Sequence, residues 1–263
     1  MKTKIIFFDI DGTILSHRNG HISDSTKKAI KKAQANGHLA FINTGRTIAE
    51  IEGDITDVGF DGYVCGCGTY ISHQGTVLYQ TTISKDITKM LINDLRSYQI
   101  DAVLEGTTTI YYNNQPLSPL IQRLHDSQAN DRNLNVRSWD DKDITIDKFC
   151  MWPATQEGSD YICEKYKDIF DFIIRENGLL FEVIPKGHSK ATGIEFLLSH
   201  LNIPHDNTYA IGDGANDLPM LEYAKYSIAM GNSSEDILEI VSFITEDVDQ
   251  DGIAHALRHF SII

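Results

Sequence analysis

Apolar residues occur in short runs along the chain, and stretches with helical spacing lie between them. The first run, Ile5–Phe8, ends abruptly at Asp9, which is typical of a buried parallel strand that stops at its carboxyl end. A second run at 38–43 ends at Thr44 in the same way. Strand and helix alternate here, which predicts a parallel sheet with helices on both faces. The other elements expected in this part of the chain are helices at 23–36 and 47–52 and a strand at 62–66.

The pattern changes near residue 75. Two short apolar stretches at 101–105 and 108–112 are separated by Gly106, which predicts an antiparallel pair. This mixture of hairpins and helices predicts a separate α+β module at 81–185, inserted between core segments 1–80 and 186–263. The remaining elements expected in the module are helices at 85–98, from 119 and at 158–167, strands at 144–152, 171–175 and 179–184, and a turn at Glu176–Gly178.

The first pattern resumes at Lys190. Ile194, Leu197 and Leu198 share one face of a predicted amphipathic helix. The whole chain is therefore predicted to have an α/β fold with a parallel-sheet core. Its last expected elements are strands at 208–212, 226–230 and 243–245 and helices at 218–224, 234–241 and 253–260.

Composition is that of an ordinary soluble globular protein, with 263 residues, 41% of them apolar and 23% charged. The formal net charge of -14 argues against nucleic acid or an anionic membrane as a partner. The apolar run near the start is too short for a signal peptide, and no segment has the length of a membrane span. We therefore expect a cytoplasmic protein, either a monomer or a small homo-oligomer.

Four cysteines in a chain of this length do not form a disulfide framework. Cys65 and Cys67 alternate along a strand-like stretch, which favours core packing. Metal binding by this pair is the weaker interpretation, because no matching ligand pair stands nearby.

Four polar clusters follow expected strands or the return from the inserted module. Together they suit the transfer of a phosphoryl group, which requires an in-line nucleophile, cations and hydrogen-bond donors. Taken singly, each has a plain structural interpretation, such as an acidic turn or a solvated lysine. The clusters are Asp9-Ile10-Asp11-Gly12-Thr13, Thr44-Gly45-Arg46, Lys190 with Gly193, and Gly212-Asp213-Gly214-Ala215-Asn216-Asp217.

In this scheme Asp9 attacks phosphorus and forms an aspartyl phosphate. Asp11 protonates the leaving oxygen and then takes a proton from the attacking water. These two acids need opposite protonation states, which their environments can provide. Thr44 donates its hydroxyl to a phosphoryl oxygen, and Lys190 neutralises charge between nucleophile and phosphate.

Mg²⁺ is the expected cofactor, because this hard cation takes one or two carboxylates and completes its shell with water and phosphate oxygens. Asp213 is expected to be the second metal carboxylate beside Asp9. Asp217 has three open interpretations: it holds metal-bound water, orients Lys190, or caps the helix that follows it.

The chain resembles the haloacid dehalogenase superfamily of phosphatases, and most closely its Cof-like subgroup. DIDGT, NTGR, KATG, GDGANDLPML, AMGNSSEDI and DQDGIAHAL carry this resemblance over nearly the whole length. It implies a Rossmann-like core with a large cap inserted after the third core strand. It also implies that Asp9 and Asp213 share one Mg²⁺, with the main-chain carbonyl of Asp11 as a further ligand. One departure is Cys67-Gly68, where family members usually carry Asn-Gly.

The leading hypothesis is therefore a Mg²⁺-dependent phosphatase acting on a small phosphorylated metabolite, such as a sugar phosphate or a phosphorylated cofactor. A phosphomutase and a low-turnover phosphometabolite sensor are the alternatives. Residues expected to contact substrate are Gly12, Thr13, Gly45, Arg46, His188 and Asn216. Specificity is expected to depend on the cap, where packing or surface roles are also open for Glu105, Tyr112, Arg137 and Trp152.

Overall fold

The computed structural model describes residues 2–114, 118–175 and 178–263. Its contacts divide the chain into two compact units. The first comprises Met1–Gly45, Ile51–Tyr79 and Ser189–Ile263, and the second comprises Arg46–Glu50 and Gln80–His188. That the second unit acts as a cap stays a prediction. Glu176 and Asn177 of the expected turn lie outside the described residues.

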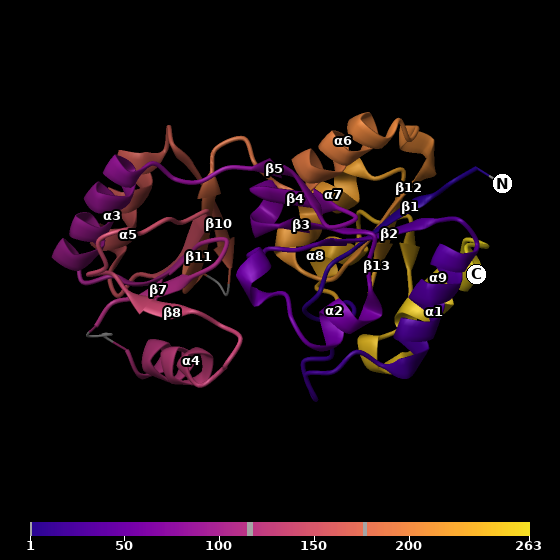
Figure 1. Ribbon diagram of the computed structural model, residues 1–263, viewed down its shortest axis with the longest axis horizontal. Coiled ribbons are helices and arrows are strands. Elements are labelled where there is room, and N and C mark those ends of the chain that lie inside the picture. The colour runs from indigo at the N-terminus through magenta and orange to yellow at the C-terminus, as the bar shows by residue number, and fades with distance from the viewer. Residues whose placement is uncertain (1, 115–117, 176–177) are drawn as a thin grey trace. The chain divides into compact units, whose positions relative to one another are not determined.

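A sheet of eight strands in the described residues forms the centre of the first unit, in the order β14-β13-β12-β1-β2-β3-β4-β5 (Figure 1). Neighbours from β14 to β3 pair in parallel, and β4 is antiparallel to β3. The strands are β1 (Ile5–Phe8), β2 (Leu39–Asn43), β3 (Gly62–Cys65), β4 (Tyr70–His73), β5 (Thr76–Gln80), β12 (Thr208–Gly212), β13 (Tyr226–Ala229) and β14 (Phe243–Ile244).

Strand β1 is central because its four apolar residues are buried on both faces. Ile5 pairs with Leu39 of β2 and with Thr208 of β12, and the same register continues to Phe8. The three strands therefore end level with one another. The residues that follow them meet at one edge of the sheet, where ligands bind in open parallel sheets.

Helices cover both faces of this sheet. Helix α6 (Lys190–Leu201) and helix α7 (Leu218–Tyr223) pack on the face that includes Ile5 and Phe7. Helix α1 (Asp24–Ala35), which is capped by Ser23, and helix α9 (Gly252–His259) lie on the other side (Figure 1). The smaller elements are α2 (Asp54–Val58), α8 (Glu235–Leu238) and 3-10 turns at Gly66–Gly68, His205–Asn207, Ala215–Asp217 and Val248–Gln250.

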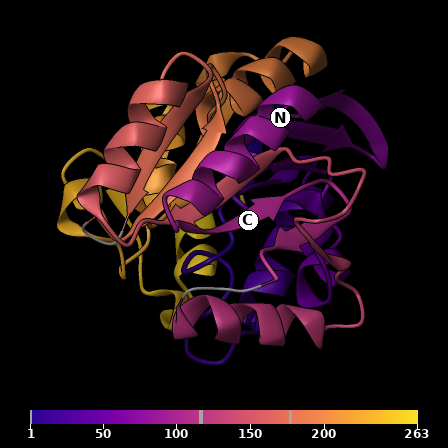
Figure 2. The same cartoon turned by 90° about the vertical axis from the view of Figure 1, so that its left-hand side faces the viewer.

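The second unit has its own sheet, with strand order β10-β11-β9-β6-β7-β8. Its neighbours are antiparallel except β7 and β8, which pair in parallel. Helices α3 and α5 lie side by side over one face (Figure 2), where Leu91, Leu95 and Ile162 meet Leu104 and Phe149 in a buried core. The elements are α3 (Lys85–Ser97), β6 (Asp101–Glu105), β7 (Ile110–Tyr112), α4 (Pro119–Ala129), β8 (Val136–Ser138), β9 (Lys148–Trp152), α5 (Gln156–Tyr166), β10 (Phe170–Arg175), β11 (Leu180–Pro185) and a 3-10 turn at Ile48–Glu50.

The predicted fold class is confirmed: the protein is α/β with a Rossmann-like parallel-sheet core. Three local predictions were wrong. A 3-10 turn replaces the helix expected at 47–52. Strand β8 lies between the helix expected from 119 and the strand expected at 144–152, where no strand was predicted. Cys67 does not continue a strand, because it lies in the 3-10 turn after β3 with φ 53° and ψ 40°. In the described residues, no helix has both the length and the apolar character needed to cross a membrane.

Candidate active site

Asp9, Thr44 and Asp213 lie at the level edge formed by β1, β2 and β12. The Asp9 amide still donates to the carbonyl of Ile211 at 3.0 Å, and the Thr44 amide donates to that of Val64 at 2.9 Å. Their main chains are therefore fixed by the sheet. Asp9 is 5% exposed and Thr44 is 1% exposed, so both side chains are enclosed at this edge.

A tight turn connects Asp9 with the Asp213 side chain. The Ile10 carbonyl accepts from the amides of Thr13, Ile14 and Leu15 at 3.2, 3.0 and 2.8 Å, respectively. Thr13 Oγ1 then donates to Asp213 Oδ1 at 2.9 Å. Gly12 has φ +83°, and a Cβ at this position would overlap the Asp213 carboxylate. Gly12 is thus required both by its backbone conformation and by the close approach of Asp213.

Lys190 brings an ammonium into direct contact with Asp9 and with Asp217 of the loop after β12. It opens helix α6, is 1% exposed, and places Nζ 2.5 Å from Asp9 Oδ1 and in contact with Asp217 Oδ1. Its main-chain carbonyl accepts from Asn43 Nδ2 at 2.9 Å. Lys190 is therefore held at both ends, with its ammonium between two carboxylates.

Asp217 contacts both Lys190 and the loop after β12. Its second oxygen, Oδ2, accepts from the amides of Asp213 and Gly214, each at 2.9 Å. Its side chain makes no capping hydrogen bond to helix α7. The helix-cap interpretation of Asp217 was therefore wrong: its oxygens turn back toward the loop that carries Asp213.

Carboxylate oxygens of Asp9, Asp213 and Asp217 lie within 4.8 Å of one another. Burial, reinforced by the charge of Asp217, raises the pKa of Asp9 to about 8 and that of Asp213 to about 6. Burial acts to lower the pKa of Lys190, but the carboxylates of Asp217 and Asp9 outweigh it and raise that pKa above its usual value. Three carboxylates face one ammonium, which leaves the cluster with excess negative charge when all are ionised.

This donor set fits a divalent cation. It offers only oxygen ligands, which suit hard cations such as Mg²⁺, and its excess charge would be neutralised by one such ion. Asp11 is partly buried, and its side chain does not belong to the group of three. The predicted metal contact of its main-chain carbonyl stays a prediction.

The other predicted substrate residues fall in two places. Gly45 and Asn216 are buried in the first unit with Gly12 and Thr13. Arg46 and His188 belong to the second unit, where His188 Nδ1 lies 3.0 Å from the carbonyl oxygen of Pro185. Their roles toward substrate stay predictions.

Each of the four second-unit candidates has a structural contact within that unit. Glu105 is buried and pairs with Lys148 at 3.0 Å, and the Tyr112 hydroxyl donates to Gln128 at 2.5 Å. Arg137 pairs with Asp141 at 3.3 Å, and Trp152 packs against the small core that contains Tyr112. These contacts support packing or pairing roles for all four.

Two asparagines of the site were missed by sequence reasoning. Asn232 donates to the carbonyl of Gly12 at 2.9 Å and accepts from the amide of Val248 at 3.0 Å. Asn43 fixes the main chain of Lys190, as described above. Both lie within the stretches NTGR and AMGNSSEDI, and their positions beside or just after expected strands were the available signal.

The unusual Cys67 also lies close to this site. Its amide donates to the carbonyl of Thr44 at 3.0 Å, and its backbone is left-handed. Asn tolerates that conformation better than most residues, which gives a backbone reason for Asn to be usual there. This chain keeps the backbone turn and replaces the polar side chain by a buried thiol.

Two buried carboxylates, a partly buried third and a buried lysine lie at the carboxyl edge of a parallel sheet, and the comparisons identify the family. The model of the haloacid dehalogenase-like hydrolase family matches residues 6–257. The chain belongs to this family, and it is a phosphatase-type hydrolase.

Relatives match over the full length. Protein YkrA of Bacillus subtilis (strain 168) is 28% identical over 263 residues, which cover 100% of both chains. The 5-amino-6-(5-phospho-D-ribitylamino)uracil phosphatase YitU of the same organism is 26% identical, covering 99% of each chain. Among solved structures, the HAD subclass IIB sugar phosphatase BT4131 has a TM-score of 0.85 at 26% identity, covering 99% of this chain and 100% of its own.

Proposed function

We propose that this chain is a Mg²⁺-dependent phosphatase that hydrolyses a small phosphorylated metabolite through an aspartyl phosphate on Asp9. The observation that carries this proposal is the largely buried group of Asp9, Asp213 and Asp217, with Lys190 paired to Asp9 and Asp217. A buried cluster with this much negative charge is costly to maintain for structure alone. A bound cation and an anionic substrate give it a function.

In the first step, an oxygen of Asp9 attacks phosphorus and the bond from phosphorus to the leaving oxygen breaks. Asp11 gives its proton to that leaving oxygen, so the product departs as an alcohol. In the second step, Asp11 takes a proton from water as the water oxygen attacks phosphorus. The bond between phosphorus and Asp9 breaks, which releases phosphate and restores the carboxylate.

Lys190 keeps Asp9 oriented through its 2.5 Å contact and offsets charge as the phosphoryl group approaches. Thr44 contributes its hydroxyl to a phosphoryl oxygen. Asp213 and Asp217, together with Asp9, are the residues that would hold Mg²⁺, directly or through water. When bound, the cation neutralises charge on the phosphoryl oxygens and lets an acidic protein accept an anion.

The proposed substrates are sugar phosphates or phosphorylated cofactors and their precursors. Similarity to a sugar phosphatase and to a phosphatase of a phosphoribitylamino compound supports this class. We assign selection among such substrates to the second unit acting as a cap, with Arg46 and His188 as the first residues to test.

The test is release of inorganic phosphate from a panel of phosphorylated metabolites in the presence of Mg²⁺. We expect turnover of at least one sugar or cofactor phosphate, loss of turnover in excess chelator, and no turnover by a folded Asp9→Asn variant. Saturable binding without phosphate release would instead favour a sensor. Transfer of the phosphoryl group to a second position of the same sugar would favour a phosphomutase.

A further inference from the structure

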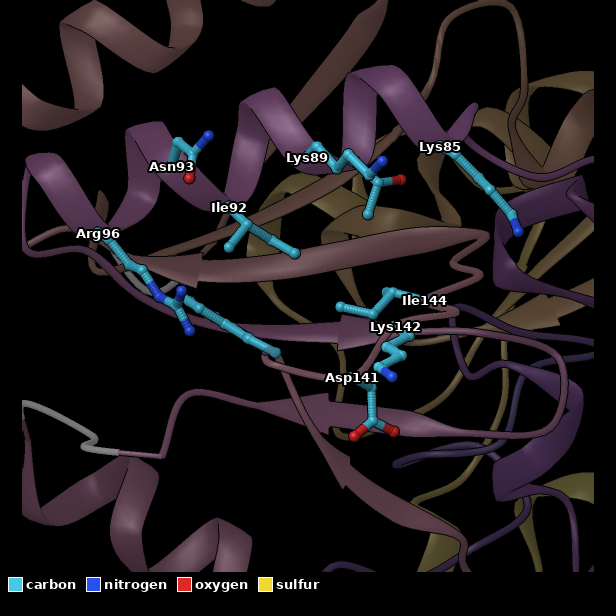
Figure 3. Close-up of a pocket in the computed structure, with 10 residues that line it drawn as sticks. Lys85, Lys89, Ile92, Asn93, Arg96, Asp141, Lys142 and Ile144 are labelled. Atoms are coloured by element: carbon cyan, nitrogen blue, oxygen red, sulfur yellow. The ribbon is translucent and has the colours of Figure 1, made fainter.

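A pocket in the second unit has no part in the proposed reaction. It lies between helix α3 and the segment 139–144 that precedes β9, and it has a volume of about 250 Å³ (Figure 3). This volume is just below the range of about 300–1,000 Å³ that is typical of drug-sized ligands, so it suits a smaller molecule. All of its lining residues belong to the second unit, whereas the Asp9 cluster belongs wholly to the first.

The floor of the pocket is apolar. Ile92, Trp139 and Ile144 are 6, 3 and 9% exposed and belong to the core under α3 and α5. Trp139 is fixed by its Nε1, which donates to the Tyr111 carbonyl at 3.0 Å. The floor is therefore a rigid aromatic and aliphatic surface with its polar atom already bonded.

The walls are cationic. Four of the lining residues are basic, namely Lys85, Lys89, Arg96 and Lys142, and one, Asp141, is acidic. This balance is unusual in a chain with a net charge of -14. Lys85 and Arg96 extend from the two ends of the helix face, with Ile92 between them and Ile144 opposite (Figure 3).

Helical spacing explains why the cations gather here. Lys85, Lys89 and Arg96 recur at intervals of four and seven residues, so α3 carries them on one face. Like charges four residues apart repel slightly, and an anion between them would remove that cost. The repulsion between Lys85 and Lys89 therefore favours a negative group in the pocket.

Only part of this positive charge is neutralised by the protein. Lys85 pairs with Asp143 at 3.0 Å, and Arg96 pairs with Asp140 at 2.7 Å. Asp141 is engaged with Arg137 at 3.3 Å. Lys89 and Lys142 form no ion pair with any residue that the structure describes.

We propose that this pocket binds a small organic anion, in which a carboxylate or phosphate group is carried on an apolar, preferably flat, body. The body rests on Trp139, Ile92 and Ile144, and the anionic group meets the ammonium groups of Lys89 and Lys142. Arg96, whose guanidinium carbon lies 5.9 Å from the centroid of the Trp139 ring, closes one end. This binding does not depend on the proposed phosphatase activity.

Trp139 provides the readout. The chain has two tryptophans, so Trp152→Phe leaves Trp139 as the single tryptophan in a parent variant, and its emission is excited selectively at wavelengths that tyrosine does not absorb. Phenylphosphonate is the probe, because it has a flat apolar ring and a dianionic head and lacks an ester bond to hydrolyse. We expect it to change the emission of Trp139 saturably, with weaker binding at higher salt.

Lys89→Gln with Lys142→Gln removes the two unpaired charges from this parent. Both side chains are exposed, so the double variant should have the same urea midpoint of unfolding as the parent. We expect its Kd for phenylphosphonate to rise at least threefold. Lys167→Gln is the control. It removes an exposed charge that pairs with Glu164 at the C-terminal end of α5, and it should leave the Kd for phenylphosphonate unchanged.

Three results would overturn the proposal. The first is no saturable change of Trp139 emission in the parent. The second is a rise in Kd of less than threefold in the double variant, or an equal rise in Lys167→Gln. The third is equally tight binding of benzyl alcohol, a neutral compound with the same ring, which would make this an apolar pocket without anion selectivity.

Discussion

Gly12 and Gly37 provide a matched pair that tests how closely the active-site turn is fitted to Asp213. Their φ angles are +83° and +84°, so alanine meets the same backbone strain at both positions. A Cβ at Gly37 has nothing within 4 Å, whereas a Cβ at Gly12 would lie 2.8 Å from Asp213 Cγ and nearer still to its Oδ2. A Cβ at Gly12 would also lie 2.9 Å from Nε2 of the exposed His17. The difference between Gly12→Ala and Gly37→Ala therefore isolates the steric effect on these two side chains, of which Asp213 is the closer.

The magnitudes follow from these contacts. Left-handed backbone conformation costs alanine about 1–2 kcal/mol at either site. Carbon atoms normally approach to about 3.5–4.0 Å, so Gly12→Ala must shift the Asp213 carboxylate by roughly 1 Å. That shift also strains the Thr13 hydrogen bond to a charged acceptor, which contributes about 1.5–3 kcal/mol. Gly12→Ala should thus lower the free energy of unfolding by about 2.5–5 kcal/mol.

Activity should separate the two variants more sharply. Displacement of a positioned group by about 1 Å can reduce rate about 100-fold. We therefore expect kcat/KM for p-nitrophenyl phosphate with Mg²⁺ to fall about 100-fold in Gly12→Ala and to stay within twofold in Gly37→Ala. Urea unfolding of both variants gives the stability comparison. If kcat/KM of Gly12→Ala stayed within twofold of that of the parent enzyme, the close fit between this turn and Asp213 would be refuted.

Three further predictions concern buried charges. Lys190→Met leaves Asp9 and Asp217 without their ammonium. In urea unfolding of the metal-free protein, we expect the free energy of unfolding to fall by about 3–5 kcal/mol. An unchanged urea midpoint would contradict this. Lys148→Met removes the ammonium whose Nζ lies 3.0 Å from Glu105 Oε2 and 2.9 Å from Glu182 Oε1. We expect a similar fall in the free energy of unfolding. An unchanged thermal midpoint would show that this cluster tolerates the loss. Burial raises the pKa of Asp147 to about 6 from 3.8, so the folded state holds this proton more tightly than the unfolded state does. The stability that Asp147 contributes, about 3 kcal/mol, is present below about pH 4 and is lost as pH rises through about 6. Asp147→Asn should flatten the pH dependence of the free energy of unfolding between pH 4 and 7. If the slope of this dependence were unchanged, the raised pKa of Asp147 would be contradicted.

Much of the first unit could be predicted because its signals are local. Ile5–Phe8 is apolar at every position and ends in an acid, which is enough to predict a buried strand with a polar carboxyl end. Parallel strands end at one edge, but the strand pattern does not give their order. The meeting of Asp9 and Asp213 was implied by the family resemblance, and the structure pairs β1 with β12. The structure adds the contacts of Lys190 with Asp9 and Asp217, which are 181 and 27 residues away in sequence.

Other features depend on tertiary partners that leave no local signal. Strand β8 is short and partly polar, and its pairing with β7 defines it. The Asn232 contact with Gly12 joins residues 220 positions apart. The cationic pocket likewise requires α3 to lie against the segment 139–144. Helical spacing places Lys85 and Lys89 on one face, but the apolar floor beneath them comes from the fold.

The most direct test of the central claim is chemical trapping of the phosphorylated residue. The enzyme is mixed with p-nitrophenyl phosphate and Mg²⁺, quenched within one turnover, reduced with borohydride, and mapped by peptide mass spectrometry. An aspartyl phosphate on Asp9 predicts reduction of the side chain at position 9 to that of homoserine, with no such product without substrate. Phosphate release at the normal rate with position 9 unmodified, or with the product at another acid, would contradict the account.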